Sequence, residues 1–281
     1  MLKLLVTAII FAGAAATHAQ RTELADHWAQ FDKAKIHYYD VGSGKKALVL
    51  VHGWTCSADL WRDTINAFPG YRVIALDLPG HGKSDKPKVE YSMDYFARSV
   101  EAVMHAAGVQ RAVLVGHSMG TPVIRQFYRD FPTKTLGLVL VDGALRPFGP
   151  KAQTEAFFAP LKANYKENGP KFIDGLLGPT RADLRPVIRS VMVETPGYVA
   201  TSAMDGMLAE NIWTDDKISV PVLALMNGDG QWPPDNETFY RSIAPNLDYQ
   251  AWHGVSHFLF MEKPAEFNAA VKAFIQKNKL L

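Results

Sequence analysis

Short, nearly unbroken apolar runs recur along the chain, separated by segments of helical periodicity. The runs occupy residues 47–51, 73–76, 112–115, 138–141 and 222–226. Such runs are typical of parallel strands covered on both faces, because every side chain of such a strand is buried. Apolar residues recur at helical spacing over 95–107, 121–129 and 264–276. Strands that alternate with helices predict an α/β fold with a doubly wound, mostly parallel sheet.

Three further strands complete the predicted sheet. Residues 27–31 and 35–40 predict two antiparallel strands joined at Asp32-Lys33 and followed by the Gly42-Ser43-Gly44 turn. A last strand is expected over 247–252, just ahead of the final helical pattern. The expected sheet is therefore eight-stranded.

Residues 148–213 interrupt this alternation. They contain no buried-strand run but several helical pieces broken by Pro150, Pro160, Pro170, Pro179, Pro186 and Pro196. The pattern predicts a helical cap, 148–213, inserted into a core of residues 20–147 and 214–281. The cap is rich in large apolar side chains, namely Phe157, Phe158, Tyr165, Phe172, Met192, Tyr198, Met204, Met207 and Trp213. Two interpretations stay open: these side chains cover an apolar pocket, or they form a small core within the cap.

Residues 1–19 have the pattern of a secretory signal peptide. Lys3 supplies the positive charge, residues 4–16 form a short apolar run, and Thr17-His18-Ala19 offers the small residues that a signal peptidase recognises. The run is shorter than the ~20 residues that a membrane-spanning helix needs, which argues against the alternative of an uncleaved anchor. We therefore expect cleavage after Ala19 and an exported, periplasmic or secreted protein with no membrane span in its mature form.

Composition narrows the partners and cofactors to be expected. Hydrophobic residues make up 48% and charged residues 21% of the chain, as in ordinary globular proteins. The formal net charge of +2 gives no reason to expect a nucleic acid as partner. Cys56 is the only cysteine, so no intramolecular disulfide can form, and neither a CxxC nor an HExxH pattern occurs. We therefore expect neither a metal nor a cofactor.

The segment Gly116-His117-Ser118-Met119-Gly120 carries the strongest chemical signal. This G-x-S-x-G pattern stands directly after the apolar run 112–115 and directly before the helical pattern 121–129. In that context the serine occupies a tight strand-to-helix turn, and the glycines allow the backbone to pass close by. Ser118 is therefore the candidate nucleophile. The alternative is a serine that merely caps the helix.

A serine hydroxyl becomes a good nucleophile only when a base takes its proton, so a histidine is expected downstream. His257 follows the predicted strand 247–252 and precedes the final helix, on a loop that can return to the same edge of the sheet. His253 lies nearer the end of that strand and is interpreted as structural. His257 is therefore the candidate general base. The histidines expected to serve packing or loop hydrogen bonds are His52, His81, His105 and His117.

Five segments together resemble one known family. They are His52-Gly53-Trp54, the stretch DLPGHGKS at 77–84, the serine turn at Ser118, Val220-Pro221-Val222-Leu223, and Val255-Ser256-His257-Phe258 with Glu262 and Pro264. Through them the chain resembles the α/β-hydrolase superfamily from about residue 35 onward. The similarity is to its branch of small capped esterases, cofactor-free haloperoxidases and haloalkane-dehalogenase-like proteins. The order of serine, acid and histidine along the chain fits this family.

The resemblance implies an oxyanion hole made by the backbone N–H groups of Trp54 and Met119. Met119 follows the candidate nucleophile, and Trp54 belongs to the His-Gly-X turn. Two preorganised donors stabilise the negative charge that develops on the carbonyl oxygen, and losing one typically costs ~3 kcal/mol. For the side chain of Trp54 two roles stay open, lining the acyl pocket or packing the loop.

The position of the catalytic acid departs from the commonest family pattern. Most members carry a Gly-x-x-Asp after the seventh strand, but the residues here run Asn227-Gly228-Asp229-Gly230-Gln231, which puts Gly230 or Gln231 at the acid position. A second position, at the end of the sixth strand in the dehalogenase-like branch, is occupied here by Asp142. The resemblance therefore favours Asp142 as the acid, with Asp229 as the alternative. Either carboxylate would orient the imidazole and stabilise its charged form.

Together these residues predict a serine hydrolase acting on a small molecule. An activated serine beside an oxyanion hole performs acyl transfer, and with water as acceptor it hydrolyses an ester, thioester or lactone. A serine rather than an aspartate at the turn argues against dehalogenation, which needs a carboxylate nucleophile. Two other functions stay open: a degenerate hydrolase that only binds small molecules, and a perhydrolase of the haloperoxidase type. The apolar cap favours small to medium hydrophobic acyl groups.

Overall fold

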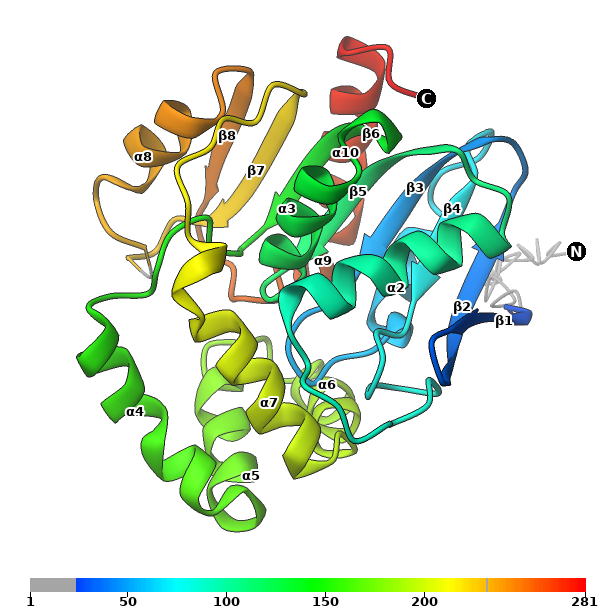
Figure 1. Ribbon diagram of the computed structural model, residues 1–281. Helices are drawn as coiled ribbons and strands as arrows, with labels where there is room; N and C mark the ends of the chain where they lie inside the picture. The colour runs from blue at the N-terminus through cyan, green and yellow to red at the C-terminus, as the bar shows by residue number, and fades with distance from the viewer. Residues whose placement is uncertain (1–23, 231) are drawn as a thin grey trace, which may run out of the picture.

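A sheet of eight strands forms the centre of the molecule (Figure 1). The computed structural model describes residues 24–230 and 232–281. The strands are β1 (Asp26–Phe31), β2 (Ala34–Val41), β3 (Lys46–Val51), β4 (Val73–Leu76), β5 (Arg111–His117), β6 (Thr135–Val141), β7 (Val222–Asn227) and β8 (Leu247–Trp252). The predicted signal peptide, residues 1–19, lies outside the described residues and stays a prediction.

The strand order in the sheet is β1-β2-β4-β3-β5-β6-β7-β8. β2 pairs with β1 and with β4 in antiparallel fashion, whereas every pair from β4 across to β8 is parallel. All residues of β4, β6 and β7 are buried, as expected for strands covered on both faces. The predicted eight-stranded, mostly parallel α/β sheet is confirmed.

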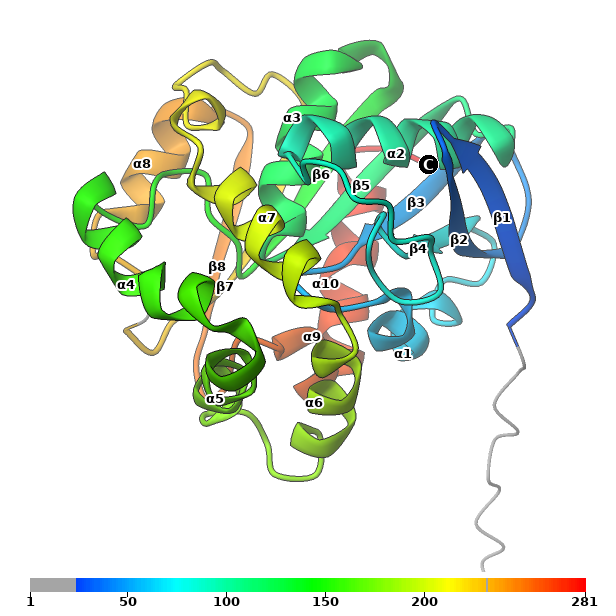
Figure 2. The ribbon, with the colours of Figure 1, turned by 60° about the horizontal axis from the view of Figure 1, so that its bottom comes forward.

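Helices cover both faces of this sheet (Figures 1 and 2). α2 (Met93–Ala106) and α3 (Gly120–Asp130) pack on one face, and α1 (Arg62–Ile65) and α10 (Pro264–Lys277) lie on the other. The shorter elements of the core are the 3-10 turns Ala58–Trp61 and Pro132–Lys134 and the helices α8 (Asn236–Ile243) and α9 (Leu259–Glu262). Within the described part of the chain, no helix has both the length and the apolar character needed to span a bilayer.

The segment between β6 and β7 is helical and lies over one end of the sheet (Figure 2). It consists of α4 (Lys151–Ala163), α5 (Tyr165–Leu177), α6 (Arg185–Val193), α7 (Gly197–Leu208) and the 3-10 turn Glu210–Ile212. The sequence left open whether its apolar side chains are buried in a core or line a pocket, and the structure shows side chains of both kinds. Ile173 and Ile188 are fully buried, whereas Phe158 and Phe172 line a cavity that also contains Ser118.

Candidate active site

Ser118 lies in the turn between β5 and α3. Its backbone has a φ of +51°, a left-handed conformation that few non-glycine residues adopt and that the surrounding structure must hold. The two glycines of the turn provide space: a Cβ on Gly116 would lie 2.3 Å from the backbone oxygen of Gly120, and a Cβ on Gly120 would lie 2.4 Å from that of Val51. The turn therefore brings β3, β5 and α3 into direct contact and places Ser118 in the wall of the cavity.

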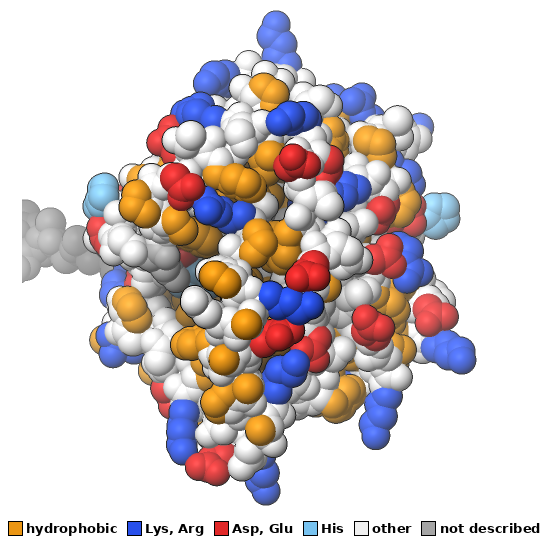
Figure 3. Space-filling view, turned by 60° about the vertical axis from the view of Figure 1, so that its left-hand side comes forward, with side chains coloured by type: hydrophobic (Ala, Val, Ile, Leu, Met, Phe, Trp, Pro, Cys, Tyr) orange, Lys and Arg blue, Asp and Glu red, His pale blue; other side chains and the backbone are white. Residues whose placement is uncertain are grey.

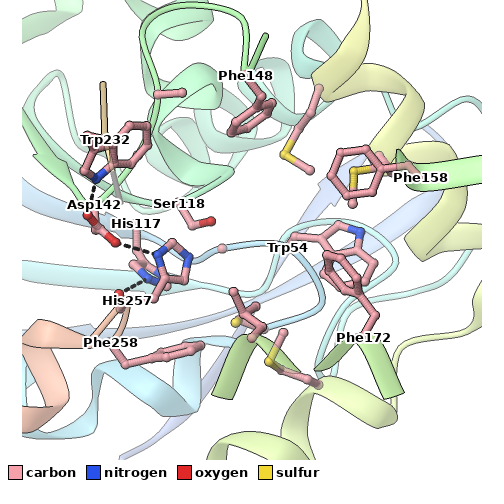
Figure 4. A pocket seen from close by; sticks show the side chains of 18 residues that line it. Trp54, His117, Ser118, Asp142, Phe148, Phe158, Phe172, Trp232, His257 and Phe258 are labelled. Atoms are coloured by element: carbon pink, nitrogen blue, oxygen red, sulfur yellow. Dashed lines mark hydrogen bonds and ion pairs between the residues drawn. The ribbon is translucent and has the colours of Figure 1, made fainter. Parts of the chain in front are cut away.

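His257 lies beside Ser118, on the loop between β8 and α9 (Figure 4). Its Nδ1 lies 2.7 Å from Oδ2 of Asp142, which directly follows β6. Because a carboxylate only accepts hydrogen bonds, Nδ1 is the donor in this contact, and in the neutral tautomer with that proton Nε2 is an acceptor. The imidazole lies between the Asp142 carboxylate and the Ser118 side chain (Figure 4). The structure thus brings together Ser118, His257 and Asp142.

Asp142 is completely buried, and its second carboxylate oxygen is also hydrogen-bonded. Oδ1 accepts one hydrogen bond from the backbone N–H of Asn227 at 2.9 Å and another from the indole Nε1–H of Trp232 at 2.7 Å. The next residue, Gly143, has no room for a side chain, since a Cβ there would lie 2.1 Å from Oγ1 of Thr121. With the bond from His257, three donors compensate for taking this carboxylate out of water.

Asp229, the alternative acid, has a different partner. Its Oδ1 lies 2.8 Å from Nδ1 of His253, and its Oδ2 accepts a hydrogen bond from the backbone N–H of Gly254 at 2.8 Å. These two bonds, that of His253 first, lower the pKa of the Asp229 carboxyl below its ordinary value. The side chain of His253 is exposed, and His257 is the histidine of this loop that lines the cavity.

Two buried histidines hold the loops around the serine in place. Nε2 of His117 donates a hydrogen bond to the backbone oxygen of His257 at 2.9 Å. His52 accepts a hydrogen bond at Nε2 from the N–H of Leu78 at 3.0 Å and donates one from Nδ1 to the backbone oxygen of Gly53 at 2.8 Å. Burial lowers the pKa of both imidazoles, so both rings are neutral. Both therefore serve packing and loop hydrogen bonds.

Gly53, which precedes Trp54, packs directly against the serine turn. A Cβ on Gly53 would lie 3.1 Å from the Cβ of Ser118. Met119 follows Ser118 and leads into α3. Trp54 and Met119, whose backbone N–H groups the family resemblance nominates for an oxyanion hole, are therefore neighbours in sequence of two residues in this contact, Gly53 and Ser118. The indole of Trp54 has a further contact, because its Nε1 donates a hydrogen bond to the backbone oxygen of Ala200 in α7 at 2.8 Å.

A cavity of about 200 Å³ lies between Ser118 and the helical segment. Its walls are mostly apolar and include Trp54, Phe148, Phe158, Phe172, Leu176, Met192, Met204, Met207, Trp232 and Phe258. Cys56 also lines it, but burial raises the pKa of this thiol to about 12, so it is not a thiolate nucleophile. Such a lining fits a small, uncharged, hydrophobic ligand.

Sequence reasoning did not identify the contributions of Trp232 and Phe148. Trp232 lies in the loop after β7, and only the fold brings its indole N–H to Asp142, which follows β6. Phe148 lies before α4 and lines the cavity. Neither residue belongs to a motif or a periodic pattern, so nothing in the sequence singled it out.

Comparisons with known proteins agree on one family. The model of the alpha/beta hydrolase fold matches residues 46–189. A non-heme chloroperoxidase of Streptomyces lividans is 30% identical over 273 residues, which cover 87% of this chain and 97% of that protein. A 2-hydroxy-6-oxononadienedioate/2-hydroxy-6-oxononatrienedioate hydrolase of Paraburkholderia phymatum is 32% identical over 220 residues, 76% of this chain and 72% of that protein.

A solved structure extends this likeness to three dimensions. Est816, described as an N-acyl homoserine lactone degrading enzyme, is 27% identical with a TM-score of 0.70, and the match covers 88% of this chain and all of that one. The family model alone spans more than half of the sequence. This chain therefore belongs to the α/β hydrolase fold family, in its branch of esterases and haloperoxidases.

Proposed function

We propose that this protein is a serine hydrolase that cleaves an ester, thioester or lactone of a small to medium hydrophobic substrate through an acyl-enzyme on Ser118. The observation that carries the proposal is the 2.7 Å hydrogen bond between Nδ1 of His257 and Oδ2 of Asp142, beside Ser118. This bond favours the tautomer in which Nε2 can take up the serine proton. The left-handed backbone at Ser118 and the apolar cavity support the same function.

Acylation begins when Oγ of Ser118 attacks the carbonyl carbon of the substrate and its proton passes to Nε2 of His257. The Asp142 carboxylate stabilises the imidazolium that forms. The carbonyl oxygen becomes an oxyanion, for which the backbone N–H groups of Trp54 and Met119 are the donors in this proposal. Collapse of the tetrahedral intermediate breaks the ester C–O bond, and His257 gives its proton to the leaving alcohol.

Deacylation repeats these steps with water in place of the serine. His257 takes a proton from a water molecule while the oxygen of that water attacks the acyl carbon. The bond between that carbon and Oγ of Ser118 then breaks, and the proton on His257 returns to Oγ. The products are the carboxylic acid and the free enzyme.

The substrate class in this proposal follows from the cavity. Its walls are aromatic and methionine side chains, and apolar groups leave water favourably when they enter such a space, at roughly 25 cal/mol per Å². An anionic acyl group would instead lose its hydration without gaining a cationic partner, because no lysine or arginine is among the described residues that line the cavity. The relative described as degrading N-acyl homoserine lactones supports including lactones.

Labelling with a fluorophosphonate probe tests the proposal. The wild-type protein should gain the mass of one probe molecule and turn over p-nitrophenyl butyrate, and Ser118→Ala should do neither. Ser190→Ala, which changes an exposed serine on α6, is the matched control and should behave like wild type. Labelling that survives in Ser118→Ala would contradict the proposed nucleophile. Binding of hydrophobic esters without labelling or turnover would favour a degenerate hydrolase.

A perhydrolase is the second candidate, because the Streptomyces lividans relative is named a non-heme chloroperoxidase. In that reaction hydrogen peroxide attacks the acyl carbon in place of water, and the product is a peroxyacid. The proposed roles of Ser118, His257 and Asp142 are the same in both reactions. Incubation with an ester and hydrogen peroxide separates them, since a perhydrolase forms more peroxyacid than carboxylic acid.

A further inference from the structure

A surface groove continues the cavity at α4. It has a volume of about 330 Å³ and is lined by Phe148, Gly149, Gln153, Thr154, Phe157 and Phe158. Phe148 and Phe158 also line the cavity at Ser118, so the two spaces share part of their walls. The groove therefore offers apolar surface, directly beside the cavity, to a substrate chain that outgrows the cavity.

A row of aromatic rings connects the serine site with the groove. The distance between ring centroids is 5.6 Å from Trp54 to Phe172, 5.8 Å from Phe172 to Phe158 and 4.9 Å from Phe158 to Phe157. Trp54 is buried, whereas Phe157 at the far end of the row is 68% exposed and Phe148 is 53% exposed. A single exposed phenylalanine is common. A row that leads from a buried cavity to exposed rings offers apolar contact along its whole length.

The groove is suited to an uncharged chain. None of the described residues that line it is charged. Figure 3 shows the side of the molecule on which α4 lies in Figure 1, where hydrophobic side chains reach the surface among charged ones. A hydrocarbon chain that covers exposed aromatic rings removes apolar area of both partners from water, which is favourable.

The position of His257 indicates which part of the substrate extends this way. The leaving alcohol must lie near Nε2 of His257, because it receives its proton from there. Trp54, Phe158 and Phe172 lie across the cavity from His257 (Figure 4). The acyl part, which is bonded to Ser118 in the acyl-enzyme, therefore extends toward these rings.

We propose that the groove along α4 binds the distal end of a long, uncharged acyl chain. The chain runs from Ser118 past Phe172 and Phe158 and leaves the cavity between Phe148 and Phe157. This inference rests on the proposed serine hydrolase function and extends its substrates from small and medium acyl groups to long ones.

Phe157→Ala tests the groove, because Phe157 lines the groove and is not among the residues that line the cavity. We expect kcat/KM for p-nitrophenyl laurate to fall about fivefold, mainly through KM, and that for p-nitrophenyl butyrate to stay unchanged. A fivefold change corresponds to about 1 kcal/mol. The matched control is Val187→Ala, which removes an apolar side chain that is 54% exposed on α6 outside the groove, and it should change neither value.

Gly149→Glu tests the same groove by adding a charge instead of removing a ring. A Cβ at Gly149 would meet only Oγ1 of Thr154, at 3.7 Å, so a side chain fits there. A carboxylate just before α4 is compatible with the helix, because its N-terminus favours negative charge. The added carboxylate disfavours the binding of a hydrocarbon chain in the groove, because the chain would displace water from the charge. Turnover of laurate should again fall at least fivefold while turnover of butyrate is retained.

The possible outcomes separate this proposal from the hydrolase function. Equal effects on laurate and butyrate, or no effect of either variant on laurate, would overturn the groove proposal while the hydrolase function stands. If Phe157→Ala changes the sedimentation coefficient but not the preference for chain length, the groove is a contact between two copies of the chain, and the proposal is again wrong. A wild-type protein that neither reacts with the fluorophosphonate probe nor hydrolyses butyrate refutes the hydrolase function, and the groove proposal with it.

Discussion

Replacing Asp142 by asparagine reverses the hydrogen bond to His257 with little change in volume. The amide oxygen can still accept hydrogen bonds from the backbone of Asn227 and from the indole of Trp232. The NH₂ group then faces Nδ1 of His257, which must act as acceptor. The proton of the imidazole therefore moves to Nε2, where it prevents the ring from accepting the proton of Ser118.

We expect kcat of Asp142→Asn to fall about 10⁴-fold, as in another serine enzyme that lost its orienting carboxylate. At 1.36 kcal/mol per factor of ten, this is ~5.4 kcal/mol of transition-state stabilisation. KM should change by less than about threefold, because the substitution removes an interaction that stabilises the transition state and not the bound substrate. The control is Asp229→Asn, whose carboxylate is hydrogen-bonded to His253 and Gly254, and its kcat should stay within about twofold of wild type.

Hydrolysis of p-nitrophenyl butyrate and the rate of labelling by a fluorophosphonate probe measure both variants. Thermal unfolding shows whether each variant is folded. A loss of activity in Asp229→Asn with near-normal activity in Asp142→Asn would refute the reasoning and assign the orienting role to Asp229. Normal activity in both variants would show that neither aspartate has this role.

Trp232→Phe removes the indole N–H that binds Asp142 but keeps a ring in the cavity wall, and we expect the labelling rate and kcat to fall about tenfold. An unchanged kcat would show that the backbone donor suffices. Gly116→Ala places a Cβ 2.3 Å from a backbone oxygen, so urea denaturation should show a loss of roughly 3 kcal/mol or more, whereas Gly175→Ala, in open space on α5, should cause no loss. Burial lowers the pKa of His117 well below its ordinary 6.5, so below that pH the unfolded chain binds a proton that the folded chain does not. The free energy of unfolding should therefore fall with decreasing pH, by up to about 1.4 kcal/mol per pH unit from this group, until the folded pKa is reached. Denaturation curves of wild type and His117→Phe at several pH values measure this pH dependence. An equal pH dependence in both proteins would contradict its attribution to His117.

The sheet could be predicted from the sequence because its signal is local. A strand covered on both faces favours apolar residues at successive positions, so β4, β6 and β7 stand out as apolar runs. β4 has the predicted bounds, β7 is longer by one residue at its end, and β6 begins at Thr135 rather than at residue 138. The sequence patterns predict none of the core helices α1, α8 and α9. α1 and α9 have four residues each and are too short to show a period, and α8 has only three buried positions.

The partner of His257 could not be decided from the sequence. Asp142 follows β6 and Asp229 follows β7, and these strands are neighbours in the sheet, so both carboxylates are within reach of the loop after β8. The backbone of Asp142, with a φ of +44°, and the donors from the neighbouring strand end turn its carboxylate toward the imidazole. These contacts join residues far apart in the chain, and no local pattern records them.

In the helical segment between β6 and β7, too, local patterns predict the elements and contacts between distant residues decide which side chains form the site. The segment's prolines and the absence of strand runs predict a helical insertion, and its apolar content leaves open a covered pocket or a small core. Phe157 and Phe158, as adjacent phenylalanines, are equivalent in the sequence. Successive residues of a helix point about 100° apart, so only one of them faces the cavity, and the packing of α4 against its neighbours decides that it is Phe158. The sequence by itself determined the α/β sheet and singled out the serine turn, because hydrophobic periodicity and glycine spacing act between near neighbours. Only the tertiary structure decided which carboxylate meets His257 and which aromatic rings lead out of the cavity, because both depend on packing between distant segments.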